Sequence, residues 1–329
     1  MSEKMRWLFF ITRRIAKGLL VVLIATVANF ALIHLAPGDP AMVLAGEAGA
    51  SDPQFIEQLH REFGLDRPFA QQLLIYVEQV ASGNLGYSYR QQTGVAELIL
   101  DRLPATLALT ASGYLLALIL GLSFGYVAAT TRLRPVGEAI TVIATLLYAT
   151  PIFLTGLAGV LVFSVWLGWL PAFGSTSVGA DLGGVEYAAD YARHLLLPTL
   201  TLGLFYVAVY ARLTRAGMLI VKDADFIKTA RCKGLSPRRI HVAHMLRNAL
   251  LPIITLAGIQ AGQIVGGAVL VETIFAWPGI GRLAFDALLQ RDYNVLLGVF
   301  LVSSIVVVIF NIVTDIAYTL IDPRIELLA

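Results

Sequence analysis

The sequence has little of what a soluble enzyme needs. Only 14% of its 329 residues are charged, and Cys232 is the single cysteine. One cysteine excludes an intrachain disulfide and a cysteine-based metal cluster. The nucleotide-binding pattern GxxxxGK[ST] and the zinc-protease pattern HExxH do not occur. His241 and His244, three residues apart, would need further ligands from elsewhere to hold a metal. We expect no enzyme, no metal site and no cofactor bound by this chain.

Long apolar runs are what the sequence does have. Hydrophobic residues make up 57% of the chain, and its mean hydropathy is +0.76. Six runs are each long enough to cross about 30 Å of hydrocarbon at about 1.5 Å per helical residue. They lie at about 7–36, 104–131, 138–169, 195–221, 249–271 and 293–321. The sequence therefore predicts an all-α polytopic membrane protein with six transmembrane helices.

Basic residues are distributed unevenly between the connecting segments. Nine Lys or Arg lie within 212–247, whereas 37–99 holds three Arg against eight Asp or Glu. Because loops rich in Lys and Arg stay on the cytoplasmic side, both termini are predicted to be cytoplasmic. The first apolar run is too long for a cleaved signal peptide and is predicted to be a retained span. No row of ionisable residues crosses the spans, which argues against a proton relay.

These patterns divide the chain into three parts. Residues 1–36 are predicted to form the cytoplasmic N-terminus and the first span, 37–103 an extracytoplasmic subdomain, and 104–329 a five-helix membrane core. In the subdomain, Ser51-Asp52-Pro53 predicts a helix start, and the apolar residues between Phe69 and Val80 predict an amphipathic helix. Such helices can lie on the membrane surface or pack on the bundle, and they can also contact a soluble partner.

A basic elbow is predicted between the fourth and fifth spans, at about 222–247. The stretch "KTARCKGLSPRR" at 228–239 contains five Lys or Arg. Asp225 suits a helix start, Gly234 a helix C-cap, and Ser236-Pro237 the start of a second helix. Ala230 and Gly234 are expected to leave a flat patch for another protein. The alternative is a solvated basic loop that rests on anionic lipid.

The elbow resembles the coupling loop in membrane subunits of binding-protein-dependent ABC importers. The stretch "DFIKTARCKGLSPRR…LRNALLP" matches that loop at Ala230, Gly234 and Leu251-Pro252. Lys228, where most members have a glutamate, and the late Leu-Pro resemble the dipeptide, oligopeptide and nickel branch. Five further segments and Arg13-Arg14 resemble the first permease subunit of that branch. The segments are "APGDP" at 36–40, "FGLDRP" at 63–68, "GNLGYSYR" at 83–90, "RLPATLAL" at 102–109 and "ETIFAWPGIGRLAFDALLQRDY" at 272–293.

The resemblance implies a type I ABC importer transmembrane fold in a bacterial inner membrane. It also implies a second homologous permease subunit, two ATPase subunits that bind ATP and Mg, and a substrate-binding protein, with lipid around the chain and no nucleic acid. The residues implied to couple to the ATPases are Asp225, Phe226, Ala230, Arg231, Gly234, Leu235, Ser236 and Pro237.

Two further sets of residues are candidates for the pathway. The outer segment contains Glu272, Phe275, Trp277, Pro278, Gly279 and Gly281. Its aromatic residues either anchor at the membrane interface or belong to a rigid hairpin that frames the outer mouth and meets the binding protein. Gly258, Gly262 and Gly266 recur every four residues, which favours close helix packing, either within the chain or as a moving seam against a partner.

We expect the chain to form half of the translocation pathway for di- and oligopeptides. The same architecture could import nickel chelates, glutathione or another small solute. A stand-alone channel or secondary transporter is the alternative of a different class, and it would purify without ATPase partners.

Overall fold

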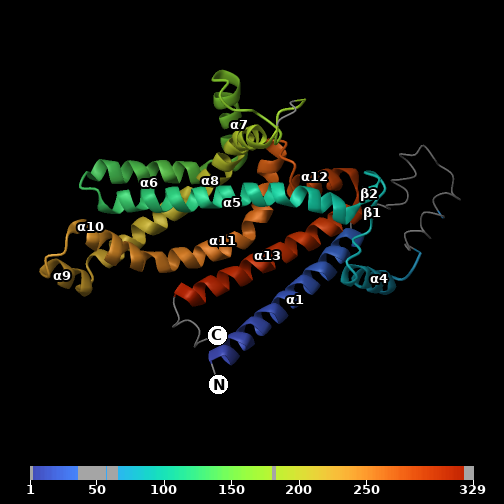
Figure 1. Ribbon diagram of the computed structural model, residues 1–329, viewed down its shortest axis with the longest axis horizontal. Helices are drawn as coiled ribbons and strands as arrows, with labels where there is room; N and C mark the ends of the chain where they lie inside the picture. Colours follow the sequence, from blue (N-terminus) through green and yellow to red (C-terminus); the bar gives the residue numbers. More distant parts are fainter. Residues whose placement is uncertain (1–2, 36–56, 58–65, 180–182, 322–329) are drawn as a thin grey trace. The chain divides into compact units, whose positions relative to one another are not determined.

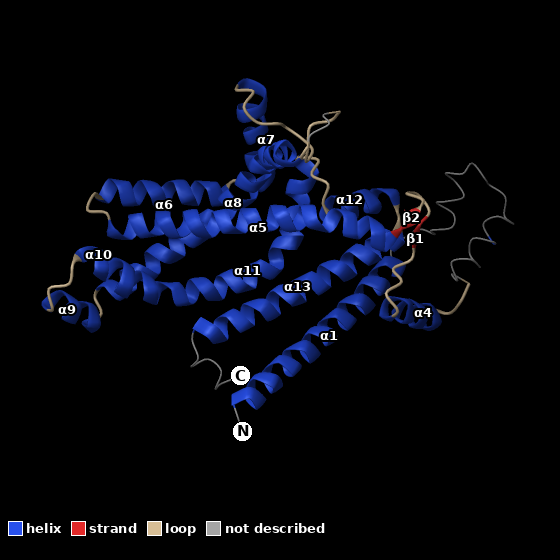
Figure 2. Cartoon of the chain, viewed as in Figure 1, coloured by secondary structure: helices blue, strands red, loops and turns tan. Residues whose placement is uncertain are grey.

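The computed structural model of the chain is helical apart from one short hairpin and the connecting loops (Figure 2). It describes residues 3–35, 57, 66–179 and 183–321. Within these ranges four helices are long and apolar enough to cross a membrane singly, and two bent helix pairs bring the number to as many as six. The six predicted spans agree with this upper number. The predicted helix start at Ser51 lies outside the described residues.

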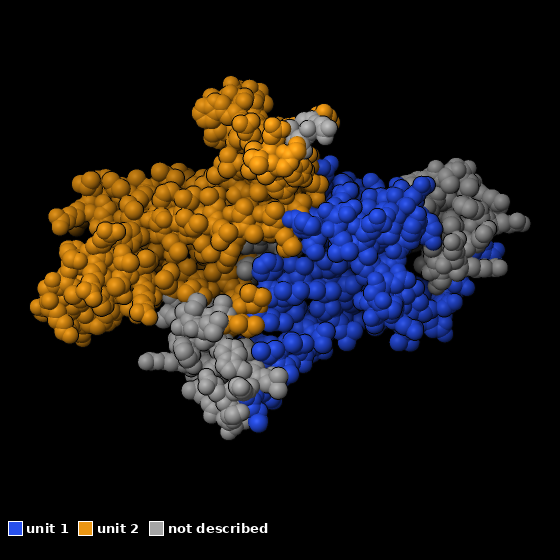
Figure 3. Space-filling model, in the orientation of Figure 1, with its two compact units in different colours: residues 1–104, 279–312 blue, residues 105–278, 313–329 orange. Residues whose placement is uncertain are grey.

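One compact unit comprises residues 1–104 and 279–312 (Figure 3). It contains α1 (Glu3–Leu35), α4 (Phe69–Ala81), the strands β1 (Tyr87–Ser88) and β2 (Thr93–Gly94), α12 (Ile280–Gln290) and most of α13 (Tyr293–Ile321). The amphipathic helix predicted over 69–80 is confirmed as α4. It packs on α1, because the Phe30 ring lies 5.5 Å from Phe69 and 5.2 Å from Tyr76 between centroids.

The antiparallel hairpin is tied to the start of α13. Tyr87 pairs with Gly94 in its register. The Ser88 hydroxyl donates to the Asp292 carboxylate at 2.5 Å, and the Asn294 amide donates to the Tyr87 carbonyl at 3.0 Å. Segments about 200 residues apart in sequence are thereby held together within this unit.

The other unit comprises residues 105–278 and 313–329. It holds most of α5 (Val95–Thr130), then α6 (Arg134–Ala149), α7 (Ile152–Gly159), η1 (Val160–Trp166) and α8 (Gly184–Lys222), followed by α9 (Asp225–Cys232), α10 (Pro237–Arg239), η2 (Ile240–Leu246) and α11 (Arg247–Ile274) (Figure 1). Ala117, Val207, Tyr210, Ile253 and Ala257 form a buried cluster where α5, α8 and α11 meet. This grouping assigns α12 and α11 to different units. The division of the chain after residues 36 and 103 stays a prediction.

The third predicted span is broken. The sequence predicts one helix over 138–169, but α6 ends at Ala149 and the following helix is bent from it by 101°. Pro151 disfavours a helical conformation in the residue before it and cannot donate a backbone hydrogen bond. Thr150 accordingly adopts φ −79° and ψ 126°, which is extended. A continuous third helix is therefore the wrong expectation.

Helices α5 and α8 approach each other closely at glycines. A Cβ added to Gly125 would lie 2.5 Å from the carbonyl oxygen of Ala211. One added to Gly121 would overlap the Tyr210 side chain. Small residues permit such backbone contact between membrane helices. The close approach of α5 and α8 therefore depends on Gly121 and Gly125.

Candidate functional site

The basic elbow has the predicted helix–turn–helix geometry. Helix α9 begins after Ala224, whose backbone is extended, and has Asp225 in its first turn. A carboxylate there is favoured by the helix dipole. Lys228 lies 2.9 Å from the Asp225 carboxylate, but both side chains are exposed. An exposed pair of this kind contributes about 0.5 kcal/mol or less, so the elbow must be held by other contacts.

A Schellman motif ends α9 at Gly234. The Leu235 amide donates to the Ala230 carbonyl at 3.2 Å, and the Gly234 amide donates to the Arg231 carbonyl at 2.9 Å. Gly234 has φ +74°, the left-handed conformation that this motif requires in the first residue after the C-cap. The predicted C-cap is confirmed, and it fixes the direction in which the chain leaves α9.

The second arm of the elbow starts at Pro237 and continues into α11. Ser236 has the extended backbone of an N-cap, and Pro237 occupies the first turn of α10. The Ser236 side chain makes no capping hydrogen bond, so the residue caps by backbone conformation alone. From Pro237 the helix runs through α10 and η2 to Leu250 in α11, and it is bent by 44° before it continues from Pro252. The second arm of the elbow is therefore covalently continuous with α11 and joins its membrane part through one bend.

A buried cluster lies beneath the elbow and joins it to α8 and α11. It consists of Met218, Ile227, Ala230, Ile240, Met245 and Ala249, with Leu235 packed against it. Ala230 is only 5% exposed. The expectation that Ala230 and Gly234 form a flat docking patch is therefore wrong for Ala230, since its methyl group faces the core. Gly234 is exposed, and an added Cβ there would meet no atom within 4 Å.

The solvent-exposed face of the elbow carries most of its basic side chains. Phe226 is 46% exposed, and Arg231, Cys232, Lys233, Arg238 and Arg239 are all exposed. His241 packs edge-on to Tyr126 of α5, with ring centroids 6.4 Å apart. Partial burial, together with Arg231 and Lys222, lowers the pKa of His241 below its usual value. The elbow thus presents a cationic surface with one exposed aromatic ring, on a rigid base.

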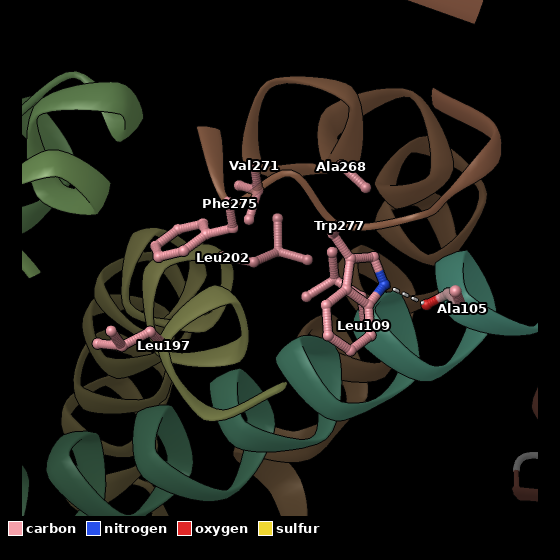
Figure 4. Packing of buried hydrophobic residues seen from close by; sticks show 8 residues of the cluster. All are labelled: Ala105, Leu109, Leu197, Leu202, Ala268, Val271, Phe275 and Trp277. Atoms are coloured by element: carbon pink, nitrogen blue, oxygen red, sulfur yellow. Dashed lines mark hydrogen bonds between the residues drawn. The ribbon is translucent and has the colours of Figure 1, made fainter. Parts of the chain in front are cut away.

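The predicted outer segment is buried. Glu272, Phe275 and Trp277 are each at most 1% exposed. The indole N–H of Trp277 donates to the Ala105 carbonyl of α5 at 2.9 Å (Figure 4). The Trp277 ring lies 5.2 Å from that of Tyr191 between centroids. The Glu272 carboxylate accepts a 2.6 Å hydrogen bond from Thr106. Gly279 and Gly281 are also buried, and Pro278 is half-buried.

This burial changes the interpretation of the outer aromatic residues. Neither Phe275 nor Trp277 can anchor at a lipid interface or touch a soluble partner while buried here. Ala276, between them, has φ +49°, and the Trp277 amide donates to the Glu272 carbonyl at 2.8 Å. The segment is a tight turn whose side chains fasten α11 to α5 and α8. It stays a prediction that this segment frames the outer mouth of the pathway. Its buried aromatic side chains would do so only by fastening α11 to α5 and α8.

The structure also bears on the glycine stripe of α11, on a GxSxG match in α5 and on possible metal ligands. Gly258 is buried in α11, while the surroundings of Gly262 and Gly266 are outside what the structure describes. Residues 121–125 read GLSFG and so match the GxSxG pattern, but Ser123 lies inside α5 and donates to the Ile119 carbonyl at 2.7 Å. A nucleophile on that pattern sits at a sharp strand-to-helix turn. Among the described residues no group of three or more His, Cys, Asp and Glu could hold a metal.

Two arginines of the basic stretch lie in a membrane helix, as the predicted fourth span at about 195–221 implies. Arg212 and Arg215 fall in the basic stretch 212–247, yet both lie inside α8, which continues to Lys222.

Comparison with known proteins identifies relatives along the whole chain. Residues 121–327 match the family described as "Binding-protein-dependent transport system inner membrane component", and residues 7–110 match its N-terminal companion. A "Di/tripeptide transport system permease protein DppB" of Pseudomonas aeruginosa is 42% identical, over 97% of this chain and 99% of that protein. A "Dipeptide transport system permease protein DppB" of Escherichia coli is 36% identical, over 96% and 98%.

Solved structures share the fold at lower identity. The inward-facing MetNI methionine ABC transporter matches with a TM-score of 0.56 and 18% identity, over 69% of this chain and 97% of the matched chain. An amino acid ABC transporter with histidines matches with a TM-score of 0.51 and 15% identity, over 68% and 94%. These matches confirm the type I importer transmembrane fold.

Proposed function

The chain belongs to the family of binding-protein-dependent transport system inner membrane components, and from that premise we propose that it forms half of the translocation pathway for di- and oligopeptides in an ATP-driven importer. One observation carries the peptide assignment. Two relatives that match almost end to end are named for dipeptide or di- and tripeptide transport. Nickel chelates, glutathione and other small solutes are the alternatives to be tested.

The proposed partners follow from what this chain lacks and what it presents. It has no P-loop of its own, so ATP and Mg would be bound by two ATPase subunits. The basic elbow would dock on these subunits at the cytoplasmic side. A second homologous permease subunit would complete the pathway, and a binding protein would deliver the substrate from outside. Both termini are proposed to be cytoplasmic.

The elbow's packing supports a mechanical role. Its buried cluster includes Met218 of α8, Ile227 and Ala230 of α9, and Ala249 of α11. Closely packed interiors shift as units rather than deform gradually. Closure of the ATPases would therefore move α9 together with the ends of α8 and α11. The rigid turn at Gly234 would transmit that displacement instead of absorbing it.

Reconstituted transport tests the proposal. The chain is assembled with the second permease, the ATPases and the binding protein in proteoliposomes, and uptake of labelled dialanine is measured with and without ATP. ATP-dependent uptake is expected. Uptake that is equal without ATP, or purification without ATPase subunits, would instead support a channel or carrier. A melting shift of the binding protein with nickel–histidine but not with peptides would overturn the peptide assignment.

A further inference from the structure

A cation and two aromatic rings meet on the surface shared by α6 and α8. The guanidinium carbon of Arg212 lies 5.7 Å from the centre of the Tyr148 ring. The Tyr148 ring in turn stacks on Phe205, with centroids 5.3 Å apart and planes inclined by 25°. Tyr148 is 45% exposed, and Arg212 is exposed as well. The three side chains thus form an open surface rather than part of a core.

The Arg212 side chain points away from the basic end of α8. Phe205 and Arg212 are seven residues apart, about 10 Å along the helix, and both touch the same tyrosine ring. That ring must lie between them along α8, so the guanidinium reaches back towards the helix N-terminus. Arg212 already lies about 15 Å before Lys222, where α8 ends.

This direction is unfavourable for an arginine that faces lipid. Arginines in membrane helices normally extend towards the nearer interface to keep the charge in water. Arg212 extends towards the middle of the apolar segment instead. A cation–π contact with one tyrosine does not offset the loss of hydration in hydrocarbon. Helix α8 has 39 residues, about 58 Å, and is longer than the hydrocarbon is thick, so the exposed Arg212 faces water either beyond the hydrocarbon at the Lys222 end or along a pathway.

No carboxylate on the same helices neutralises this charge. Helix α8 has no Asp or Glu between Asp190 and Asp223, and α6 has none after Glu138. In the described part of the chain, the Arg212 guanidinium makes a cation–π contact with the Tyr148 ring. Arg215, one turn further on, shares a small hollow with Arg212, Thr141 and Ala144, and its buried Nε has no hydrogen-bond partner among the described atoms. Two cations thus face the same surface.

We propose that Arg212, with Tyr148 and Phe205, is a transient contact site in the pathway for the terminal carboxylate of a peptide. The guanidinium would pair with the carboxylate, and the stacked rings would contact apolar side chains. An arginine binds a carboxylate through two parallel hydrogen bonds, which gives the contact its orientation. A free peptide ammonium would be repelled, so the site would favour one direction of the peptide. This inference rests on the proposed peptide transport.

A thiol reporter next to the site tests the inference directly. Thr145 is exposed and lies one turn before Tyr148 on α6. Its substitution Thr145→Cys in a Cys232→Ser chain gives a single reactive thiol on this chain. The rate of its modification by a hydrophilic maleimide is measured in the assembled, nucleotide-free transporter with dialanine, with dialanine amide or with neither.

Dialanine is expected to slow the modification by about threefold or more, and the amide by clearly less, because only the acid carries the carboxylate. Arg212→Gln should remove the difference between acid and amide, and Arg212→Lys should keep part of it. Arg134→Gln, which removes an exposed arginine from the first turn of α6, is the matched control and should leave the difference unchanged.

Four outcomes would overturn the site. They are a reporter thiol that does not react, equal slowing by acid and amide, a difference that survives Arg212→Gln, and loss of subunit assembly in Arg212→Gln. The first would place the surface against lipid or a subunit, and the last would make Arg212 part of an ion pair between subunits. Dialanine uptake by the unsubstituted transporter is measured in parallel. Its absence would refute the proposed function, whereas normal uptake with an indifferent reporter would refute only this site.

Discussion

At the scale of single residues, backbone conformation and burial assign different roles to residues that look alike in sequence. Ala230 and Gly234 are neighbours on the elbow, but one is packed in a core and the other is open to solvent at φ +74°. Trp277 and Trp166 are both apolar and aromatic, but their exposed fractions are 0% and 70%. Substitutions at these positions should therefore differ in kind as well as in size.

Gly234→Val should destabilise the elbow through the backbone alone. An added side chain would meet no neighbour, but a β-branched residue in the left-handed region costs roughly 1–2 kcal/mol. The purified subunit should melt at a lower temperature, and peptide-stimulated ATP hydrolysis in the assembled transporter should fall. Gly234→Asn is the control, because asparagine tolerates this conformation. Equal loss in both variants would show that the conformation is not the cause.

Trp277→Phe should remove one buried hydrogen bond while retaining most of the packing. The Ala105 carbonyl would lose its indole donor, at a cost of about 1 kcal/mol or somewhat more. Trp277→Ala should cost about 3–5 kcal/mol, because a large cavity would follow. Thermal unfolding of the purified protein in detergent measures both. Trp166→Phe should be nearly neutral, and a comparable loss there would contradict the assignment of Trp277 to the core.

At the scale of helices and their contacts, the sequence predicts that the helices exist and about how long they are. It does not predict where they bend or break. Apolar runs of sufficient length predict the spans regardless of context. Pro104 and Pro198 lie inside helices, whereas Pro252 follows a 44° bend and Pro151 marks a 101° bend. Nothing local distinguishes these four prolines, because neighbouring helices decide whether the lost hydrogen bond is tolerated.

In the candidate site, too, some features could be predicted from the sequence and others could not. The elbow could be predicted because its caps and turn are local, and α9 ends where Gly234 implies. The burial of Phe275 and Trp277 depends on Ala105 and Tyr191, which are far away in sequence. The Arg212 and Tyr148 pair likewise depends on how α6 packs on α8. Contacts between distant segments leave no periodic pattern in the residues that make them.

The close contact between α5 and α8 predicts the effect of a glycine substitution. Gly125→Ala should destabilise the protein although alanine is the better helix former by about 1 kcal/mol. Its methyl group would lie 2.5 Å from the Ala211 carbonyl oxygen, and relieving the overlap means parting two backbones, at about 1–3 kcal/mol.

Gly183→Ala is the matched control for that substitution. Gly183 has φ −97° and open space around its Cβ position. Its substitution should change the melting temperature little. If Gly125→Ala proved as stable as the unsubstituted protein, the helices would not be in backbone contact at this level.

At the scale of the whole molecule, the proposed function requires that the rigid basic elbow connects this permease to moving ATPase subunits. Its buried cluster and its exposed charge should be separable by mutation. Ala230→Glu would place a carboxylate in the cluster with Met218 and Ile240, so the subunit should insert but melt earlier and lose transport. Lys233→Glu should leave melting unchanged and weaken ATPase association alone. Normal uptake with Ala230→Glu would refute the coupling role of the cluster.

The most direct measurement uses the single cysteine of the chain. Cys232 is exposed on α9, so a photoreactive maleimide can be attached to the purified transporter without altering the elbow's core. Irradiation should link this chain to an ATPase subunit, with a yield that changes when ATP is bound. The control is a Cys232→Ser chain that carries Gly183→Cys at the other end of α8, which should give no such product. A probe at Cys232 that links only to lipid, or that gives equal product in both chains, would contradict docking of the elbow on an ATPase subunit.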